Sequence, residues 1–556
     1  MGLSDTSANM GKGHPKANER LDDLQPYRGS SNFAARFFIL VSLAQGPGEN
    51  WSHIKQYVLK DAVMQSAWLA LLTGLFTTGL GVGLAWLTAA YDFPLSRLFR
   101  WAFALPLAIP PYIAAYTYSA MLGYTGVVQT TLRNTFGLQL SQGWFNIMSV
   151  QGAVFIFTMF LFPYVYLIAR AFLESQTGAY VENARLLGRG PWSVFWLVVL
   201  PISRPAIAGG VILVCFEVLG DYGVVSYFGI STISTAIFKT WFGMYDIASA
   251  SRLAAWLMIG VLGLFLLERQ LRRQRRYSAT SGKSRPLVRR RLRGAGGAAA
   301  CMFGAVVMLV SFVIPVAQLV VWATWTADEV WHEGFYRIIG DTVAVAIVPT
   351  ALTMVAAAIV AVSVRQFGGI FGYMLAKAVT AGYSIPGAII AIGVLAVFIK
   401  LDGWLAPVYA ALSLGTGEAP LVLSLSIVML VAAYVVRFMA TGYNALEAGF
   451  EKIGPQYAEA SRLLGRGRTQ TFLRVELPLL KGALLSGTVL TFVEIVKELP
   501  LALLLRPFNF QTLATKTYQY ASDERIHEAS VPALCIVVVS LASVYLLNRI
   551  ERGMEV

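Results

Sequence analysis

The sequence carries little charge for its length. Of its 556 residues, 13% are Asp, Glu, Lys or Arg, while 56% are hydrophobic and the mean hydropathy is +0.62. Soluble domains carry about one quarter charged residues, so this composition excludes a soluble globular protein. Apolar runs long enough to cross a bilayer recur along the chain, and they predict an all-α polytopic membrane protein.

Residues that build disulfides, metal centres and nucleotide sites are scarce as well. The three cysteines lie in apolar segments without a CxxC pair, and the four histidines are scattered singly. Neither pattern predicts a disulfide framework or a zinc-type site. The sequence also lacks a Walker A motif and a glycine-rich phosphate loop, so we expect no enzyme activity and no cofactor in this chain.

The net charge of +14 is concentrated in one place. Eleven Lys and Arg residues fall between Arg269 and Arg293, directly after an apolar segment. A basic cluster beside a membrane helix is typical of cytoplasmic loops and favours contact with anionic lipid headgroups. We therefore expect membrane lipid, and not nucleic acid, as the partner of this linker.

Apolar runs bounded by charges and turns predict eleven membrane spans. A twelfth is expected in the first half, where Phe33–Ala44 is the candidate. Its roughly twelve residues are short for a crossing that needs about 20, so it either crosses with help from its flanks or lies in the interface. The eleven predicted spans are residues 62–90, 99–122, 149–173, 203–219, 250–267, 298–324, 341–363, 370–400, 420–440, 479–496 and 528–548.

Two stretches of the chain are nearly the same. The segment from Tyr180 to Pro201 returns 277 residues later, from Tyr457 to Pro478, with twelve of 22 paired positions identical. A repeat of about half the chain predicts two tandem membrane units related by a pseudo-twofold axis. The expected organisation is a polar N-terminal segment (residues 1–50), a first unit (51–267), a basic linker (268–297) and a second unit (298–556).

The number of predicted spans sets the sidedness. Two spans separate the first repeated segment from the linker, and four more separate the linker from the second segment, so all three lie on one side. The loop with Arg97 and Arg100 falls on that side, whereas the acidic loop 325–341 falls on the other. The positive-inside rule then places both repeated segments, the linker and the C-terminus in the cytoplasm.

Each repeated segment has the features of a short surface helix. An acid and a base lie three positions apart on one face, a glycine follows where a helix ends in a left-handed residue, and a proline begins the next span. We expect the charged edge to be exposed and the leucines to be anchored below it. The alternative is a passive loop whose likeness only records a duplication.

The pattern Glu-Ala-Ala, then Gly, then Leu-Pro resembles the EAA loop of binding-protein-dependent ABC importer permeases of the type I class. Here it reads Glu182-Asn183-Ala184 in the first copy and Glu459-Ala460-Ser461 in the second. In that family the loop is a coupling helix that seats in a cleft of the ATPase. The resemblance implies docking through Glu182, Arg185, Leu186, Gly188, Pro201, Glu459, Arg462, Leu463, Gly465 and Pro478.

The same resemblance implies the fold and the partners. The fold is two tandem type I transmembrane units with 11–12 helices, in a bacterial inner membrane. The partners are two copies of a separate ATPase, which hold the ATP and Mg, and a periplasmic substrate-binding protein.

Fusion of two such units is similar to the ferric-iron permease branch. The strings that resemble this branch are Leu105–Tyr112, Val225–Ile230, Lys239–Asp246, Lys497–Pro500 and Leu504–Phe508. Ferric iron is therefore the expected substrate. A thiamine or other organic-cation importer, or an ion-coupled secondary transporter, remains the alternative, although a secondary transporter has no need of a repeated polar helix.

Intramembrane carboxylates are costly and therefore mark a candidate pathway. Glu217 and Asp221 share a helix face, and Glu494 and Glu498 repeat them at the same spacing. We expect the four to converge near the central axis, joined by the phenol of Tyr222. Trivalent iron prefers oxygen ligands, so Glu217 and Glu494 are candidate transient metal ligands. The alternatives are an ion pair between Lys497 and Glu498, and a capping role for Asp221.

Prolines interrupt the spans at corresponding places in the two halves. They are Pro106, Pro110 and Pro111 in the first half and Pro386 in the second. Broken helices are common beside transport sites, although kinks without any gating role give the same pattern.

Overall fold

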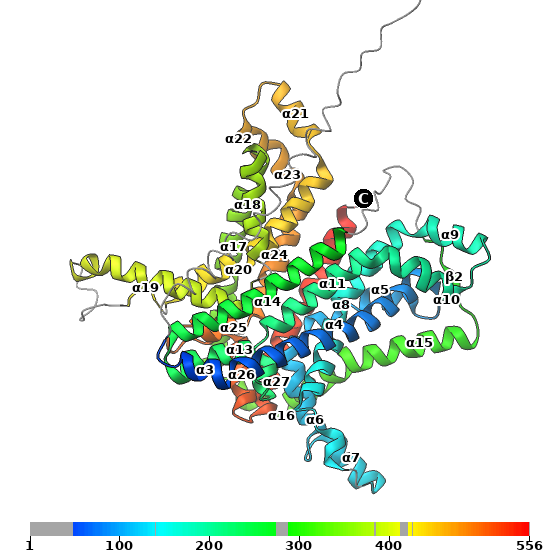
Figure 1. Ribbon diagram of the computed structural model, residues 1–556, viewed down its shortest axis with the longest axis horizontal. Coiled ribbons are helices and arrows are strands. Elements are labelled where there is room, and N and C mark those ends of the chain that lie inside the picture. The colour runs from blue at the N-terminus through cyan, green and yellow to red at the C-terminus, as the bar shows by residue number, and fades with distance from the viewer. Residues whose placement is uncertain are drawn as a thin grey trace, which may run out of the picture.

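The computed structural model describes residues 48–138, 141–273, 287–367, 369–382, 385–411, 421–424 and 426–554 (Figure 1). Within these ranges the regular secondary structure is helical apart from one short parallel pairing of β1 (Tyr91–Asp92) with β2 (Arg290–Arg291). The predicted all-α polytopic fold is confirmed. The candidate span Phe33–Ala44 lies outside the described residues.

The first unit runs from α3 to α14 and its described residues contain two 3-10 helices, η2 and η3, and two π-helical turns, η4 and η5. Its elements are α3 (Trp51–Tyr57), α4 (Leu59–Ala90), α5 (Ser96–Ala102), η2 (Leu105–Ala108), α6 (Pro111–Leu122), α7 (Val127–Phe136), η3 (Gln142–Phe145), α8 (Val150–Gln176), α9 (Gly178–Leu186), α10 (Pro191–Val194), η4 (Phe195–Val199), α11 (Leu200–Gly220), α12 (Gly223–Tyr227), α13 (Ile233–Phe238), η5 (Lys239–Gly243) and α14 (Ile247–Arg273).

The second unit runs from α15 to α27, with π-helical turns η6 and η8. Its elements are α15 (Ala295–Met308), η6 (Leu309–Val313), α16 (Ile314–Val330), α17 (Glu333–Phe367), α18 (Gly369–Ala381), α19 (Gly387–Ala411), α20 (Ile427–Ile453), α21 (Gln456–Leu463), α22 (Arg468–Thr471), η8 (Phe472–Glu476), α23 (Leu477–Leu479), α24 (Lys481–Val496), α25 (Pro500–Leu505), α26 (Leu513–Ser522) and α27 (Ile526–Met554).

Nine helical stretches in the described ranges are long and apolar enough to cross a membrane, and two bent helix pairs raise that number to eleven. One bend, of 89°, separates Ser96–Ala108 from Pro111–Phe136, and the other, of 72°, separates Arg468–Leu479 from Lys481–Val496. The predicted span 370–400 is wrong in one respect, because α18 ends at Ala381 and α19 begins after Pro386. An apolar run does not distinguish one helix from two that are broken by proline.

The repeat extends to the elements themselves. Helices α8 and α20 each have 27 residues and begin at equivalent positions. Each short surface helix, α9 and α21, is followed by one helical turn and then a five-residue π-helical turn. Capping boxes built from two threonines begin α13 and α26. The predicted duplication is therefore visible as structure.

The two units interlock through reciprocal contacts. Helix α14 of the first unit packs against α19 of the second, and α27 of the second packs against η2 and α6 of the first. The hydroxyl of Tyr116 on α6 donates a hydrogen bond to the carbonyl of Ala529 on α27, at 3.4 Å. These contacts place the break between η2 and α6 at the boundary between the units.

Small residues allow close helix packing inside the first unit. A Cβ atom placed on Gly81 of α4 would lie 2.8 Å from the Cβ atom of Val165 on α8, whereas one placed on Gly79 would meet nothing within 4 Å. In membranes, helices associate mainly by such close van der Waals packing.

We expect Gly81→Val to destabilise the protein by about 1–3 kcal/mol, because the added side chain pushes α4 away from α8. The measurement is the thermal unfolding midpoint of the detergent-solubilised protein. Gly79→Val, two residues away on the open face of α4, is the matched control. Equal midpoints for the two variants would contradict this packing.

Candidate functional site

Four acidic side chains from the two units meet in one cavity. Glu217 and Asp221 at the end of α11 line it together with Glu494 and Glu498 at the end of α24. The cavity has a volume of about 110 Å³. The convergence expected from the repeat is therefore present in the structure.

Proline breaks form another wall of this carboxylate cavity. Pro110 and Pro111, where η2 gives way to α6, and Pro386, directly before α19, all line it. The interrupted helices of both units therefore end beside the carboxylates. Pro106 does not line the cavity and lies buried in η2.

Two basic side chains compensate two of the four carboxylates. The Nζ atom of Lys497 lies 2.7 Å from Glu494, and the Nε atom of Arg437 lies 3.3 Å from Glu498. Within the described residues, no ion pair is formed by Glu217 or Asp221. The suggested pair between Lys497 and Glu498 is wrong, because Lys497 pairs with the residue one helical turn earlier.

Asp221 and Glu498 also cap the short helices that follow them. The backbone N–H of Val224 donates to Asp221 at 2.8 Å, and that of Leu501 donates to Glu498 at 3.1 Å. The two bonds occupy equivalent positions in the repeat. The capping role considered for Asp221 is therefore present in both units, and it fixes each carboxylate at the edge of the cavity.

The tyrosine that was expected in the cavity does not line it. Tyr222 lies outside the cavity lining, since its ring stacks on Phe238 with centroids 3.6 Å apart and lies 5.9 Å from the ring of Tyr518. Tyr112 of α6 lines the cavity instead, and its buried hydroxyl has no hydrogen-bond partner among the described residues. A second unsatisfied donor is an amino group of Arg437, its Nη1.

Sequence reasoning missed Arg437 and Tyr112. The signal for Arg437 was available, because an arginine inside the predicted span 420–440 requires a partner. Tyr112 carried no comparable signal, since tyrosines are common in this sequence. Among the described residues, no three His, Cys, Asp or Glu side chains are grouped to hold a metal ion. The role of Glu217 and Glu494 as transient metal ligands stays a prediction.

The repeated surface helices have the same geometry in both units. Gly188 has φ +77° and Gly465 has φ +80°, so the left-handed helix ends expected there are confirmed. The N–H of each glycine donates to a carbonyl three residues earlier, Arg185 or Arg462. Helix α9 lies at an outer end of the first unit and α21 at an outer end of the second (Figure 1).

The leucines of these helices are exposed. Leu186 is 85% exposed and Leu463 is 89% exposed, and the leucine that follows each is 82% exposed. Small or branched residues, Val181 in α9 and Ala458 in α21, face the protein instead. Within the described residues the chain itself leaves these leucines uncovered, so their anchoring below each helix stays a prediction. Each helix therefore presents an apolar tip beside its charged edge.

Removing Arg437 should destabilise the protein, because Glu498 is left buried without its cation. We expect Arg437→Gln to cost about 3–5 kcal/mol and the double variant Arg437→Gln/Glu498→Gln to recover most of that loss. The measurement is the thermal midpoint of the solubilised protein, analysed as a double-mutant cycle.

Arg337→Gln is the matched control for this cycle. The side chain of Arg337 is 85% exposed and lies 3.9 Å from Asp341, so its loss should cost less than about 1 kcal/mol. A double variant no more stable than Arg437→Gln would show that the two side chains are not coupled.

Comparisons with known proteins identify both halves of the chain. Residues 79–276 and 353–556 match the family described as binding-protein-dependent transport system inner membrane component. The Fe(3+)-transport system permease protein FbpB 2 of Haemophilus influenzae is 23% identical over 474 residues, which is 84% of this chain and 86% of that protein. The ferric transport system permease protein FbpB of Actinobacillus pleuropneumoniae is 23% identical over 518 residues, 89% of this chain and 68% of that protein.

A further relative matches a shorter stretch of the chain. The molybdenum transport system permease protein ModB of Escherichia coli K12 is 31% identical over 163 residues, which is 29% of this chain and 69% of ModB.

Proposed function

We propose that this chain, which belongs to the family of binding-protein-dependent transport system inner membrane components, carries ferric iron across the inner membrane. As a member of that family it is a multi-pass permease of an ABC importer, with both membrane units in one polypeptide. The convergence of Glu217, Asp221, Glu494 and Glu498 from the two units in one cavity is the observation that carries the proposal of iron.

The balance of charge in the carboxylate cavity favours a cation. Four acidic side chains face two basic ones, and the two basic residues both come from the second unit. An oxyanion such as molybdate would meet an excess of acidic groups, whereas a trivalent cation meets oxygen ligands of the kind it prefers. The unsatisfied hydroxyl of Tyr112 adds one more oxygen.

The relatives support the same cargo. The proteins named for ferric transport match 84% and 89% of this chain, so they share both of its units. The molybdenum transport relative matches a length of one unit. The ferric relatives match both fused units, whereas the molybdenum relative matches a length of only one. The comparisons therefore support iron more strongly than molybdate as the cargo.

The surface helices α9 and α21 are the proposed docking points for two copies of a separate ATPase, which hold the ATP and Mg. Each offers a charged edge, with Glu182 and Arg185 in α9 and Glu459 and Arg462 in α21, beside an exposed leucine tip. Exposed apolar groups rimmed by charge are typical of protein contacts. Both helices, the basic linker and the C-terminus face the cytoplasm in this proposal.

Transport would follow from movement of the two docking helices. ATP binding draws α9 and α21 together and rotates the units about their shared boundary. The breaks at Pro110 and Pro386 then change the access to the carboxylate cavity, which opens toward the periplasm, where a binding protein delivers the iron. Weak coordination by few ligands allows the ion to leave again.

Reversal of the repeated acidic charges should release the ATPase. We expect Glu182→Arg/Glu459→Arg to lower the amount of ATPase that co-purifies with the permease by at least about tenfold, because interface charges mismatched at the partner cost several kcal/mol. The measurement is the ATPase-to-permease ratio after affinity purification of the complex.

The control variant is Glu451→Arg, an equal change at an exposed position at the end of α20. It should retain the ATPase. Full retention by the double variant would remove the docking assignment.

Neutralisation of one carboxylate from each unit should stop transport. We expect Glu217→Gln/Glu494→Gln to lower uptake of radiolabelled ferric iron by at least about tenfold, because the cation loses oxygen ligands and attraction at the midpoint of its path. The measurement uses the complete importer with its binding protein, and the ATPase must still co-purify.

The matched control is Asp328→Asn/Glu329→Gln, which neutralises two exposed acids outside the carboxylate cavity. Excess unlabelled ferric iron should compete with the label, and molybdate and thiamine should not. Competition by either of these, or normal uptake by Glu217→Gln/Glu494→Gln, would contradict the proposed cargo.

A further inference from the structure

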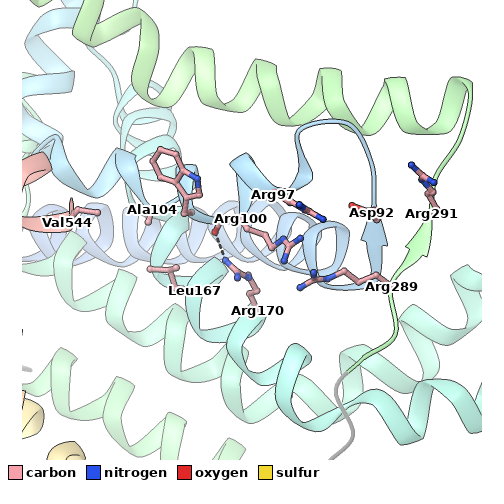
Figure 2. Close-up of a pocket in the computed structure, with 10 residues that line it drawn as sticks. Asp92, Arg97, Arg100, Ala104, Leu167, Arg170, Arg289, Arg291 and Val544 are labelled. Atoms are coloured by element: carbon pink, nitrogen blue, oxygen red, sulfur yellow. Dashed lines mark hydrogen bonds between the residues drawn. The ribbon is translucent and has the colours of Figure 1, made fainter. Parts of the chain in front are cut away.

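Five arginines surround a second, larger cavity where the first unit meets the linker. They are Arg97 and Arg100 of α5, Arg170 of α8, and Arg289 and Arg291 of the linker. The cavity has a volume of about 850 Å³, and Asp92 is the one acidic side chain among the described residues of its wall. Figure 2 shows the side chains of Arg97, Arg100, Arg170 and Arg289 gathered together, with Arg291 on the adjoining strand. We call this space the arginine pocket.

Two of the five arginines share one carboxylate and are held in place by it. Glu174 accepts hydrogen bonds from the Nε atom of Arg170 at 3.1 Å and from Arg289 at 3.0 Å. Arg170 also donates to the backbone carbonyl of Arg100. These bonds tie α8, α5 and the linker together around the arginine pocket.

The other three arginines have no acidic partner among the described residues. Arg97, Arg100 and Arg291 form no ion pair with any residue that the structure describes. The Nε atom of Arg100 is fully enclosed and has no hydrogen-bond partner within the described ranges. Like charges held this close repel one another, so the arrangement calls for an anion.

The linker is built to complete the arginine pocket. Strand β2 pairs with β1, and the N–H of Leu292 donates to the carbonyl of Asp92 at 2.8 Å. Side chains alternate along a strand, so Arg289 and Arg291 reach the arginine pocket while Arg290 between them does not line it. The basic linker is therefore seated against the first unit at this point.

The arginines that the first unit contributes to the pocket are not repeated at the 277-residue offset in the second unit. The positions equivalent to Arg97, Arg100 and Arg170 are Met374, Lys377 and Glu447. The arginine cluster is consequently not a remnant of the duplicated unit. It arises where the linker, which the chain possesses once, meets α5 and α8.

The rest of the wall indicates which anion fits. Trp101, Leu167 and Val544 form an apolar side, and Trp101 is 48% exposed and Leu167 37% exposed. Arginine binds phosphate through paired N–H groups, and tryptophan is enriched at the level of lipid headgroups. A molecule with a phosphate at one end and an acyl chain at the other matches both the arginine side and the apolar side of the pocket.

We propose that the arginine pocket binds the phosphate of an anionic phospholipid headgroup, whose acyl chains run along Trp101, Leu167 and Val544. Arg97, Arg100 and Arg291 are the phosphate ligands. The bound lipid joins α5, α8 and the linker, and so holds the linker against the first unit. The site depends neither on the cargo nor on ATPase docking. A free phosphate ion shares the headgroup chemistry but leaves the apolar wall uncovered.

The test compares lipid retention by matched variants. The full chain is placed in nanodiscs of phosphatidylcholine doped with phosphatidylglycerol, and bound lipid is counted by native mass spectrometry after release. Loss of Arg97 or Arg291 alone should lower retained phosphatidylglycerol about fivefold, and Arg97→Gln/Arg291→Gln about twentyfold. Arg290→Gln, the same change one residue away on the strand, should retain it in full.

A second arm separates the possible sources of the phosphate. Inorganic phosphate is titrated into the protein in discs of phosphatidylcholine alone, and oleate replaces phosphatidylglycerol in a parallel set. Failure of phosphate and oleate to occupy the arginine pocket supports the lipid. Phosphate binding that is lost in Arg97→Gln/Arg291→Gln would assign the pocket to the free ion and overturn the lipid. If oleate were retained as well as phosphatidylglycerol, the effect would reflect general surface charge and the site would be overturned. The same would follow if Arg290→Gln lost as much lipid as Arg97→Gln or Arg291→Gln.

Discussion

Charge buried between the two units is the constraint on which the rest of this structure depends. A carboxylate inside a membrane protein is costly unless it has a cation or hydrogen-bond donors nearby. Here Glu494 pairs with Lys497. Glu498 pairs with Arg437 and also accepts a hydrogen bond from the N–H of Leu501. The helix ends, the proline breaks and the unit boundary all meet where these groups are satisfied.

The two units differ in how their buried carboxylates are compensated. The positions equivalent to Lys497 and Arg437 in the first unit are Gly220 and Phe160. Glu217 and Asp221 therefore face the carboxylate cavity without a cation from their own unit. In a dimer of identical units both sides would carry the same charges, so fusion into one chain has allowed compensation on one side and an acidic surface on the other. The asymmetry leaves more acidic than basic side chains around the carboxylate cavity.

The sequence predicted the features that repetition makes visible. The paired carboxylates, the left-handed glycines and the surface helices were found because equivalent positions carry the same residue types. Features present once were missed, among them Arg437 and the meeting of Arg170 with the arginines of α5 and the linker in one pocket. The exposure of Leu186 and Leu463 was missed for another reason. Hydrophobicity does not indicate burial in a membrane protein, because lipid or a partner also covers apolar side chains. The break before Pro386 was identified as a proline interruption, but its place between two separate helices was not.

The linker shows how a single connection can add structure that neither unit contains. Its strand takes its place beside β1, and its arginines use an acid, Glu174, that belongs to the first unit. The equivalent residue in the second unit, Glu451, is exposed at the end of α20 and meets no such strand within the described residues. A flexible tether would need only length and solubility. A tether that supplies one wall of a cavity instead fixes where the second unit begins relative to the first, because α15 starts only four residues after β2. The fused chain thus holds its two units in register at two places, the carboxylates at their boundary and the arginines at the end of the first unit.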